Sequence, residues 1–89
     1  MIKHDITITN KLGLHTRAAA KIVNITKKHH SNISIQCNGI SADAKSIIEL
    51  LTLAATKNSI VTVTIDGIDE EVLYNELRAL ILNKFDENE

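Results

Sequence analysis

The stretch ITITNKLGLHTRAAAKIV, residues 6–23, passes from one hydrophobic pattern to another. Across residues 2–9 the even-numbered positions are mostly apolar and the odd-numbered positions are polar. This alternation predicts a half-buried strand. Residues 10–14 then form a loop that contains Gly13. From Thr16 to about Lys28 apolar side chains recur at intervals of three and four residues, which predicts a helix. The chain therefore begins as strand, loop and helix, and His15 stands where the loop becomes the helix.

Three more strands and two more helices follow by the same periodicities. The Asn38–Gly39 pair is a strong hairpin signal between two short strands. The run of β-branched residues over 60–65 is typical of a strand. We therefore expect strands at 33–37, around Ile40 and at 60–65, and helices at about 43–55 and 69–83. The acidic tail, 86–89, is expected to be frayed.

The strand residues divide into a polar side and an aliphatic side. Threonine, serine and glutamine share one side, at Thr7, Ser34, Gln36, Thr62 and Thr64. A sheet with one polar face carries its helices on the other face. We expect an α+β fold of order βαββαβα, an open-faced β-sandwich whose four-stranded, largely antiparallel sheet has three helices on one face. The length of 89 residues indicates a single domain, 1–89.

Composition excludes several classes of function. Only 2% of residues are aromatic and the net charge is −1, so the chain lacks both the stacking surface and the basic patch of a nucleic-acid binder. A single cysteine, Cys37, excludes an intramolecular disulfide and a CxxC site. No stretch approaches the roughly 20 apolar residues of a membrane span, and the first nine residues do not resemble a signal peptide. The simplest interpretation is a protein of the reducing cytoplasm.

Neither a metal site nor a cofactor site is expected. His29 and His30 are adjacent, and adjacent side chains on a helix do not face one another, so chelation by both is not expected. The favoured interpretation is that this pair belongs to a solvated helix end. No sequence motif indicates an organic cofactor.

The segment around His15 carries the chemistry. Backbone N–H groups at the start of a helix, together with the positive end of its dipole, form an anion site. A neutral imidazole placed there can attack phosphorus, and the N–H groups at Thr16 and Ala18 could then receive the phosphoryl group. Arg17 could add a bidentate, permanently charged clamp. From the spacing alone, His15 could equally be a polar N-cap residue and Arg17 a solvated charge.

The stretch from Ile8 to Ala19 resembles the active-site segment of the histidine-containing phosphocarrier proteins (HPr) of the bacterial phosphotransferase system. The family pattern is roughly G-[LIM]-H-[AT]-R-P-A, and here it reads GLHTRAA at residues 13–19. Ser46 stands where the family carries its regulatory serine, and length and element order agree as well. One residue departs from the pattern, because Ala18 replaces the usual proline; we expect a slightly looser helix start. The lead-in 9–13 and the Phe85–Asp86 ending are similar to the nitrogen-related branch (NPr).

The resemblance implies a carrier, not a free-standing enzyme. His15 would accept a phosphoryl group on Nδ1 from enzyme I charged by phosphoenolpyruvate and pass it to an EIIA-type acceptor, in sugar transport or in nitrogen and carbon regulation. Arg17 would stabilise the group in transit. In some lineages an HPr kinase/phosphorylase would phosphorylate Ser46, whose alternative role is that of a helix cap. A monomer is expected of a shuttle that presents one face to several partners in turn.

The second helix has more apolar residues than one buried face can use. An exposed apolar patch marks a binding site, and in the family this patch docks enzyme I and the acceptors. The alternative is a helix that is buried on most sides. The expected docking residues are Thr16, Ala20, Ile47, Ile48 and Leu51.

Two other functions stay open at this point. The first is a ferredoxin-like ligand-binding or regulatory module, which would use no phosphohistidine. The second is a small phosphatase in which His15 and Arg17 hold a substrate phosphate, although the sequence offers no clear second nucleophile.

Overall fold

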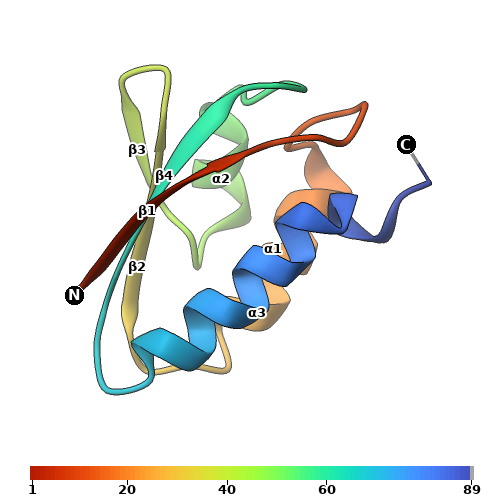
Figure 1. The fold of residues 1–89 in the computed structure, drawn as a ribbon. Helices are drawn as coiled ribbons and strands as arrows, with labels where there is room; N and C mark the ends of the chain where they lie inside the picture. Colours follow the sequence, from red (N-terminus) through yellow and green to blue (C-terminus); the bar gives the residue numbers. More distant parts are fainter. Residues whose placement is uncertain (89) are drawn as a thin grey trace.

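The computed structural model describes residues 1–88 and has the element order expected from the sequence (Figure 1). The strands are β1 (Ile2–Thr7), β2 (Asn32–Cys37), β3 (Ile40–Asp43) and β4 (Ile60–Asp66). The helices are α1 (Thr16–Thr26), α2 (Ile47–Thr52) and α3 (Glu70–Leu82), followed by a single 3₁₀ turn, η1 (Lys84–Asp86).

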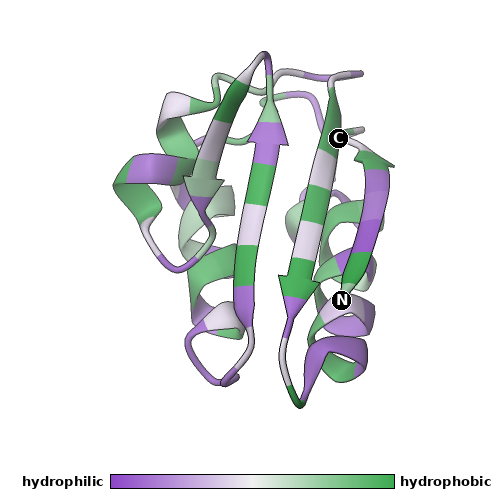
Figure 2. Ribbon diagram, turned by 90° about the vertical axis from the view of Figure 1, so that its left-hand side faces the viewer, coloured by the Kyte–Doolittle hydropathy of each residue, from purple (hydrophilic) through white to green (hydrophobic). Residues whose placement is uncertain are grey.

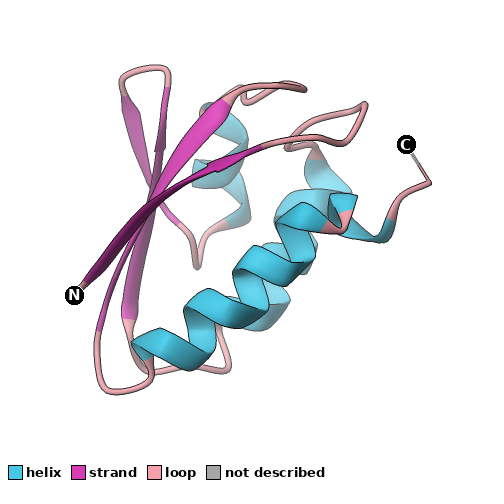
Figure 3. Ribbon diagram, viewed as in Figure 1, coloured by secondary structure: helices cyan, strands magenta, loops and turns pink. Residues whose placement is uncertain are grey.

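The four strands form one antiparallel sheet in the order β1-β4-β2-β3. In the register, Ile6 lies opposite Val61 and Ile35 lies opposite Val63, so aliphatic residues of neighbouring strands meet on the same face. The helices all lie on one side of this sheet (Figure 3). Viewed from the open side, apolar and polar residues alternate along the strands (Figure 2). The expected open-faced β-sandwich is confirmed.

The core fills the space between the sheet and the three helices. Each layer contributes side chains that are almost fully buried. The largest of them are Phe85, Ile8, Ile22, Ile35, Leu50, Leu53, Ile65, Leu73, Leu77 and Ile81. Because both the loop before α1 and the tail after α3 supply members of this core, packing fixes the position of both segments relative to the helices.

The second helix is shorter than its pattern predicts. Residues as far as Asp43 belong to β3, where Asp43 pairs with Ser34, and α2 begins only at Ile47. Ser46 caps it, since its side chain accepts a hydrogen bond from the Glu49 N–H at 3.3 Å. The expected start at residue 43 was wrong because cross-strand pairing outweighs local helical periodicity.

The helices α1 and α3 agree with their predicted spans to within two residues. The longest of the three α-helices, α3, has 13 residues. Within residues 1–88 no helix combines the length and apolarity that crossing a membrane requires.

The tail departs most from expectation, because it is folded and not frayed over its described residues. After α3 the chain makes the η1 turn, in which Phe85 is fully buried. Figure 1 shows this last segment leaving α3 at the end of the molecule where α1 begins. Glu89, the last residue of the tail, lies outside the described residues. Burial of one aromatic side chain explains why an acidic segment holds a defined path.

Candidate functional site

His15 is the N-cap residue of α1, with extended backbone angles (φ −91°, ψ 180°). The loop before it is held at two points. The Leu14 N–H donates to the Ala55 carbonyl at 2.9 Å, and the Asn10 side-chain amide donates to the Gly13 carbonyl at 2.8 Å. The imidazole keeps about a quarter of its surface exposed, at 26%. The ring is therefore fixed by its loop and remains accessible.

Gly13 allows this loop to lie against the segment that follows α2. Its φ is +66°, in the left-handed region that favours glycine. A Cβ added at Gly13 would lie 2.8 Å from the Thr56 Cα, which is closer than real Cβ atoms approach other atoms. Both observations explain why glycine occupies this position of the loop.

The start of α1 provides unpaired N–H donors beside the ring. The first intrahelical hydrogen bond runs from the Ala19 N–H to the His15 carbonyl at 2.9 Å. Among residues 1–88, the backbone N–H groups of Thr16, Arg17 and Ala18 have no hydrogen-bond partner. The first turn of α1 contains no acidic residue that would compete for them. These donors and the positive end of the helix dipole favour a bound anion.

An open cleft of about 860 Å³ brings together four of the expected site residues, all of them at the start of α1; Ser46 and the expected docking residues of α2 do not line it. It is lined by His15, Thr16, Arg17 and Ala20, and also by Leu12 and Glu87. The Arg17 side chain is exposed and makes no hydrogen bond or ion pair within the described part of the chain. Its guanidinium donors are thus open to an incoming group.

The side chains of Ala18 and Ala19 do not line this cleft. Both are fully buried in the core, so of the three successive alanines only Ala20 lines the cleft. The reason is geometric, since consecutive helical residues project about 100° apart. Ala18 can act only through its backbone N–H.

Sequence reasoning missed Glu87, which contacts the His15 ring. The His15 Nε2 hydrogen-bonds to Glu87 Oε2, and the Asn10 side-chain amide donates to Glu87 Oε1 at 3.0 Å. Desolvation raises the pKa of Glu87, but the hydrogen bonds from Asn10 and His15 and the charge of Lys21 outweigh it and hold that pKa below its ordinary value. The carboxylate is accordingly ionised at neutral pH.

No local pattern could have revealed this contact, because Glu87 and His15 are 72 residues apart in sequence. A second missed residue, Leu12, did carry a signal: it is an apolar residue in a polar loop, and it is 67% exposed beside the cleft.

The expected docking residues on α2 lie at the surface. Ile48 is 78% exposed and Leu51 is 37% exposed, while Ile47 is partly buried against the core. Leu50, on the opposite side of the helix, is fully buried. The alternative of a helix buried on most sides is therefore wrong. The Ala55 carbonyl, three residues beyond the end of α2, accepts the hydrogen bond from Leu14, so the segment after α2 lies against the loop that carries His15.

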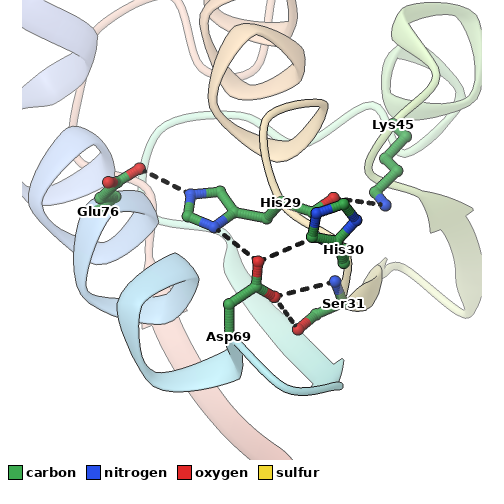
Figure 4. A network of polar contacts seen from close by, with 6 residues as sticks. All are labelled: His29, His30, Ser31, Lys45, Asp69 and Glu76. Atoms are coloured by element: carbon green, nitrogen blue, oxygen red, sulfur yellow. Dashed lines mark hydrogen bonds and ion pairs between the residues drawn. The ribbon is translucent and has the colours of Figure 1, made fainter.

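His29 and His4 lie away from the cleft and contact side chains of α3. His29 is not solvated as expected: its side chain is only 11% exposed and lies between Asp69 at 3.2 Å and Glu76 at 3.1 Å (Figure 4). The Glu76 hydrogen bond, opposed by desolvation and reinforced by Asp69, raises the pKa of His29. His4 stacks on Tyr74, with ring centroids 4.7 Å apart.

Asp69 joins His29 to the loop that precedes β2. Besides His29 it accepts hydrogen bonds from the His30 N–H at 2.9 Å and from the Ser31 N–H at 3.0 Å, as well as from the Ser31 hydroxyl (Figure 4). These hydrogen bonds lower the pKa of Asp69, and the bond from the Ser31 hydroxyl has the largest effect. The network holds the start of α3 against the turn after α1, at the opposite end of α1 from His15.

The site thus defines a class of protein: a small α+β domain that can hold an anionic group on an accessible imidazole at a helix N-terminus. Comparison with known proteins identifies the family. A model of the PTS HPr component phosphorylation site matches residues 2–83. The chain belongs to the HPr family.

Relatives match along essentially the whole chain. A phosphocarrier protein HPr of Cupriavidus necator is 45% identical over 89 residues and covers 100% of both chains. Among solved structures, HPr-C-His from Thermoanaerobacter tengcongensis has a TM-score of 0.94 at 35% identity, with 100% of both chains covered. An HPr dimer from the same organism has a TM-score of 0.77 at 36% identity and covers 98% of this chain and 100% of that one. Family membership supports a phosphoryl-carrier role in the phosphotransferase system, as distinct from that of a classical enzyme.

Proposed function

We propose that this protein accepts a phosphoryl group on His15 Nδ1 from phosphoenolpyruvate-charged enzyme I and passes it to an EIIA-type acceptor, in sugar transport or in nitrogen and carbon regulation. The observation that carries the proposal is the meeting, in one open cleft, of an accessible imidazole, an exposed Arg17 and the unpaired N–H groups that begin α1. A nucleophile with anion donors beside it is the minimum that such a transfer needs.

The transfer exchanges one P–N bond for another. The lone pair on His15 Nδ1 attacks phosphorus, and the bond between phosphorus and the donor's nitrogen breaks with its electron pair returning to the donor. The phosphoryl oxygens then meet the N–H groups of Thr16, Arg17 and Ala18, and the Arg17 guanidinium clamps them. Passage to the acceptor reverses these roles.

Partners would dock on the surface next to the cleft. It comprises Thr16 and Ala20 on α1 with Ile47, Ile48 and Leu51 on α2. Exposed apolar side chains beside a reactive group suit a partner that must bring its own reactive group within bonding distance. We place the protein in the cytoplasm, acting as a monomer.

Ser46 is a candidate for regulation by an HPr kinase/phosphorylase. It is partly exposed, and its hydroxyl caps α2 one residue before the docking residues begin. A phosphate there would add about −1.5 to −2 charge at the edge of the patch. Such a charge suits the helix N-terminus and disfavours an acidic partner surface.

The test of the carrier function is phosphorylation by enzyme I and phosphoenolpyruvate. The product should lose its phosphate in acid and keep it in base, as a phosphohistidine does. His15→Ala should abolish labelling, whereas His30→Ala, which removes an exposed histidine distant from the cleft, should leave it unchanged. Undiminished labelling of His15→Ala would overturn the proposal.

Arg17→Lys tests the clamp. Lysine supplies a point charge in place of a planar fork, so transfer should slow by at least about tenfold, roughly 1.4 kcal/mol in barrier. The measurement is a single-turnover rate from enzyme I. An unchanged rate would show that Arg17 is an ordinary surface charge.

A further inference from the structure

The tail reaches His15 by a path that costs backbone strain. Three consecutive residues, Lys84, Phe85 and Asp86, have φ angles of +56°, +54° and +63°. Residues other than glycine avoid this left-handed region because their Cβ atom crowds the backbone there. Strain of this kind persists only where the surrounding structure holds it, and it gathers at functional sites.

Four contacts hold the strained path. The Phe85 side chain is fully buried in the core. The Lys21 ammonium on α1 donates to the Phe85 carbonyl at 2.5 Å, and the Asn83 amide donates to the Asp86 carboxylate at 2.7 Å. The Glu87 N–H then bonds to the Lys84 carbonyl at 3.0 Å and closes the turn. The result is that Glu87 is delivered to α1 in one defined position.

Each oxygen of the Glu87 carboxylate has its own donor. Asn10 bonds one oxygen and His15 Nε2 bonds the other, and the Glu87 side chain is only 16% exposed. The same Asn10 amide group also donates to the Gly13 carbonyl, while its buried oxygen has no partner among the described residues. Asn10 therefore couples the loop that carries His15 to the carboxylate that contacts the ring.

The contact engages one ring nitrogen and leaves the other available. Glu87 bonds to Nε2, and within residues 1–88 no hydrogen bond reaches Nδ1. In a neutral imidazole, the hydrogen bond that one nitrogen makes determines which nitrogen carries the proton. A carboxylate on Nε2 accepts a proton there, so the lone pair lies on Nδ1.

We propose that Glu87 is a positioning residue for phosphoryl transfer: it holds the His15 proton on Nε2 and stabilises the positive charge that the ring gains when Nδ1 bonds phosphorus. This inference rests on the proposed function and deepens it. A buried carboxylate acts in the same way on the histidine of a Ser-His-Asp triad.

The His15 ring gains a positive charge during the transfer, and Glu87 stabilises that charge. When the Nδ1 lone pair forms the P–N bond, the Nε2 proton stays in place, so the ring becomes an imidazolium carrying a phosphoryl group. The Glu87 carboxylate faces that developing charge from the edge of the ring away from Nδ1. On transfer to the acceptor the ring returns to neutrality, and no proton leaves or enters.

Spectroscopy of the ring tests the contact directly. In the full-length protein at about pH 8, the His15 Nε2–H should give a downfield proton resonance that is protected from exchange. Glu87→Gln should shift this resonance upfield, and Glu87→Ala should lose it to exchange with water. The matched control is Glu71→Ala, which removes an exposed carboxylate in the first turn of α3 and should keep the resonance.

Kinetics test the consequence, with phosphoramidate as a small phosphoryl donor that needs no protein docking. Attack by His15 forms the new P–N bond and releases ammonia. We expect Glu87→Ala to slow phosphorylation by about tenfold, Glu87→Gln to slow it by less, and Glu71→Ala to match the wild type. A thermal melt of each variant confirms that it is folded at the assay temperature.

The outcomes separate this inference from the function on which it rests. If wild-type protein is phosphorylated and Glu87→Ala reacts at the same rate with an unchanged resonance, the positioning role is overturned. A faster reaction in Glu87→Ala would also overturn it, because the tail would then be a lid over His15. Failure of the wild type to accept phosphate from either donor would instead overturn the carrier function, whatever the resonance shows.

Discussion

At the scale of single residues, the geometry of the site depends on Gly13. It combines a left-handed φ of +66° with a close approach to the backbone at Thr56. The neighbouring Leu14 N–H makes the bond to Ala55 that fixes the loop. Any side chain at residue 13 must therefore displace the loop that carries His15, and stability and phosphoryl acceptance should fall together.

Gly13→Ala should lower the free energy of unfolding by at least about 2 kcal/mol, because it adds a steric clash to the cost of a left-handed alanine. Urea denaturation measures the loss. Gly39→Ala is the matched control: Gly39 also has a positive φ, +78°, but a Cβ there would meet nothing within 4 Å. Its cost should be about 1 kcal/mol. Equal losses in the two variants would contradict the packing argument.

At the scale of elements, His29 connects the end of α1 to α3. It bridges Asp69, the residue before α3, and Glu76 inside it. The raised pKa of His29 means that the folded state binds its proton more tightly than the unfolded chain does. The stabilisation is fully present below the unfolded value of about 6.5 and is lost as pH rises through the folded value.

His29→Gln should therefore remove a pH-dependent part of stability. The difference in unfolding free energy between wild type and variant should be largest near about pH 6 and shrink by about pH 8.5. Urea denaturation across this range measures it. His30→Gln is the control, because only the backbone of His30 contacts Asp69, and it should follow the wild-type profile. A difference that stays constant with pH would show that packing, and not protonation, is what His29 contributes.

At the scale of the whole molecule, the proposed phosphorylation site and the proposed docking residues belong to different elements. His15 begins α1, whereas Ile48 and Leu51 project from α2, and the Leu14–Ala55 hydrogen bond joins the two. Ile48 touches solvent over most of its surface although its neighbour Leu50 is fully buried. A partner that binds both parts can reach His15 only while this arrangement is intact.

Ile48→Glu should weaken binding of enzyme I by about five- to thirtyfold, which corresponds to the loss of about 1–2 kcal/mol from an interface contact. Leu51→Glu should weaken it similarly, and Ser46→Asp more mildly because its charge lies at the patch edge. Calorimetric titration measures the affinities. Ile48→Glu should change the unfolding free energy by no more than about 0.5 kcal/mol, as is usual at an exposed position. Normal binding by a stable Ile48→Glu variant would place the docking surface elsewhere.

Much of this protein could be read from its sequence, because the relevant signals are local. Alternation and helical spacing predicted the element order, and the polar faces of the strands predicted helices on one side only. The GLHTR segment lies at a helix start, where the backbone N–H groups are free, so its position was predicted as well. Ser46 caps α2, which is one of the two roles that the sequence left open for it.

Only the tertiary structure decided which distant groups meet. The contact of Glu87 with His15 spans 72 residues, and that of His29 with Asp69 spans 40. The helix α2 starts later than expected because β3 pairs with β2 as far as Asp43. This pairing joins residues that are distant in sequence, so no local pattern contains it. Local patterns report what a segment prefers on its own, whereas the burial of Phe85 and the pairing of strands depend on surfaces that exist only once the chain has folded.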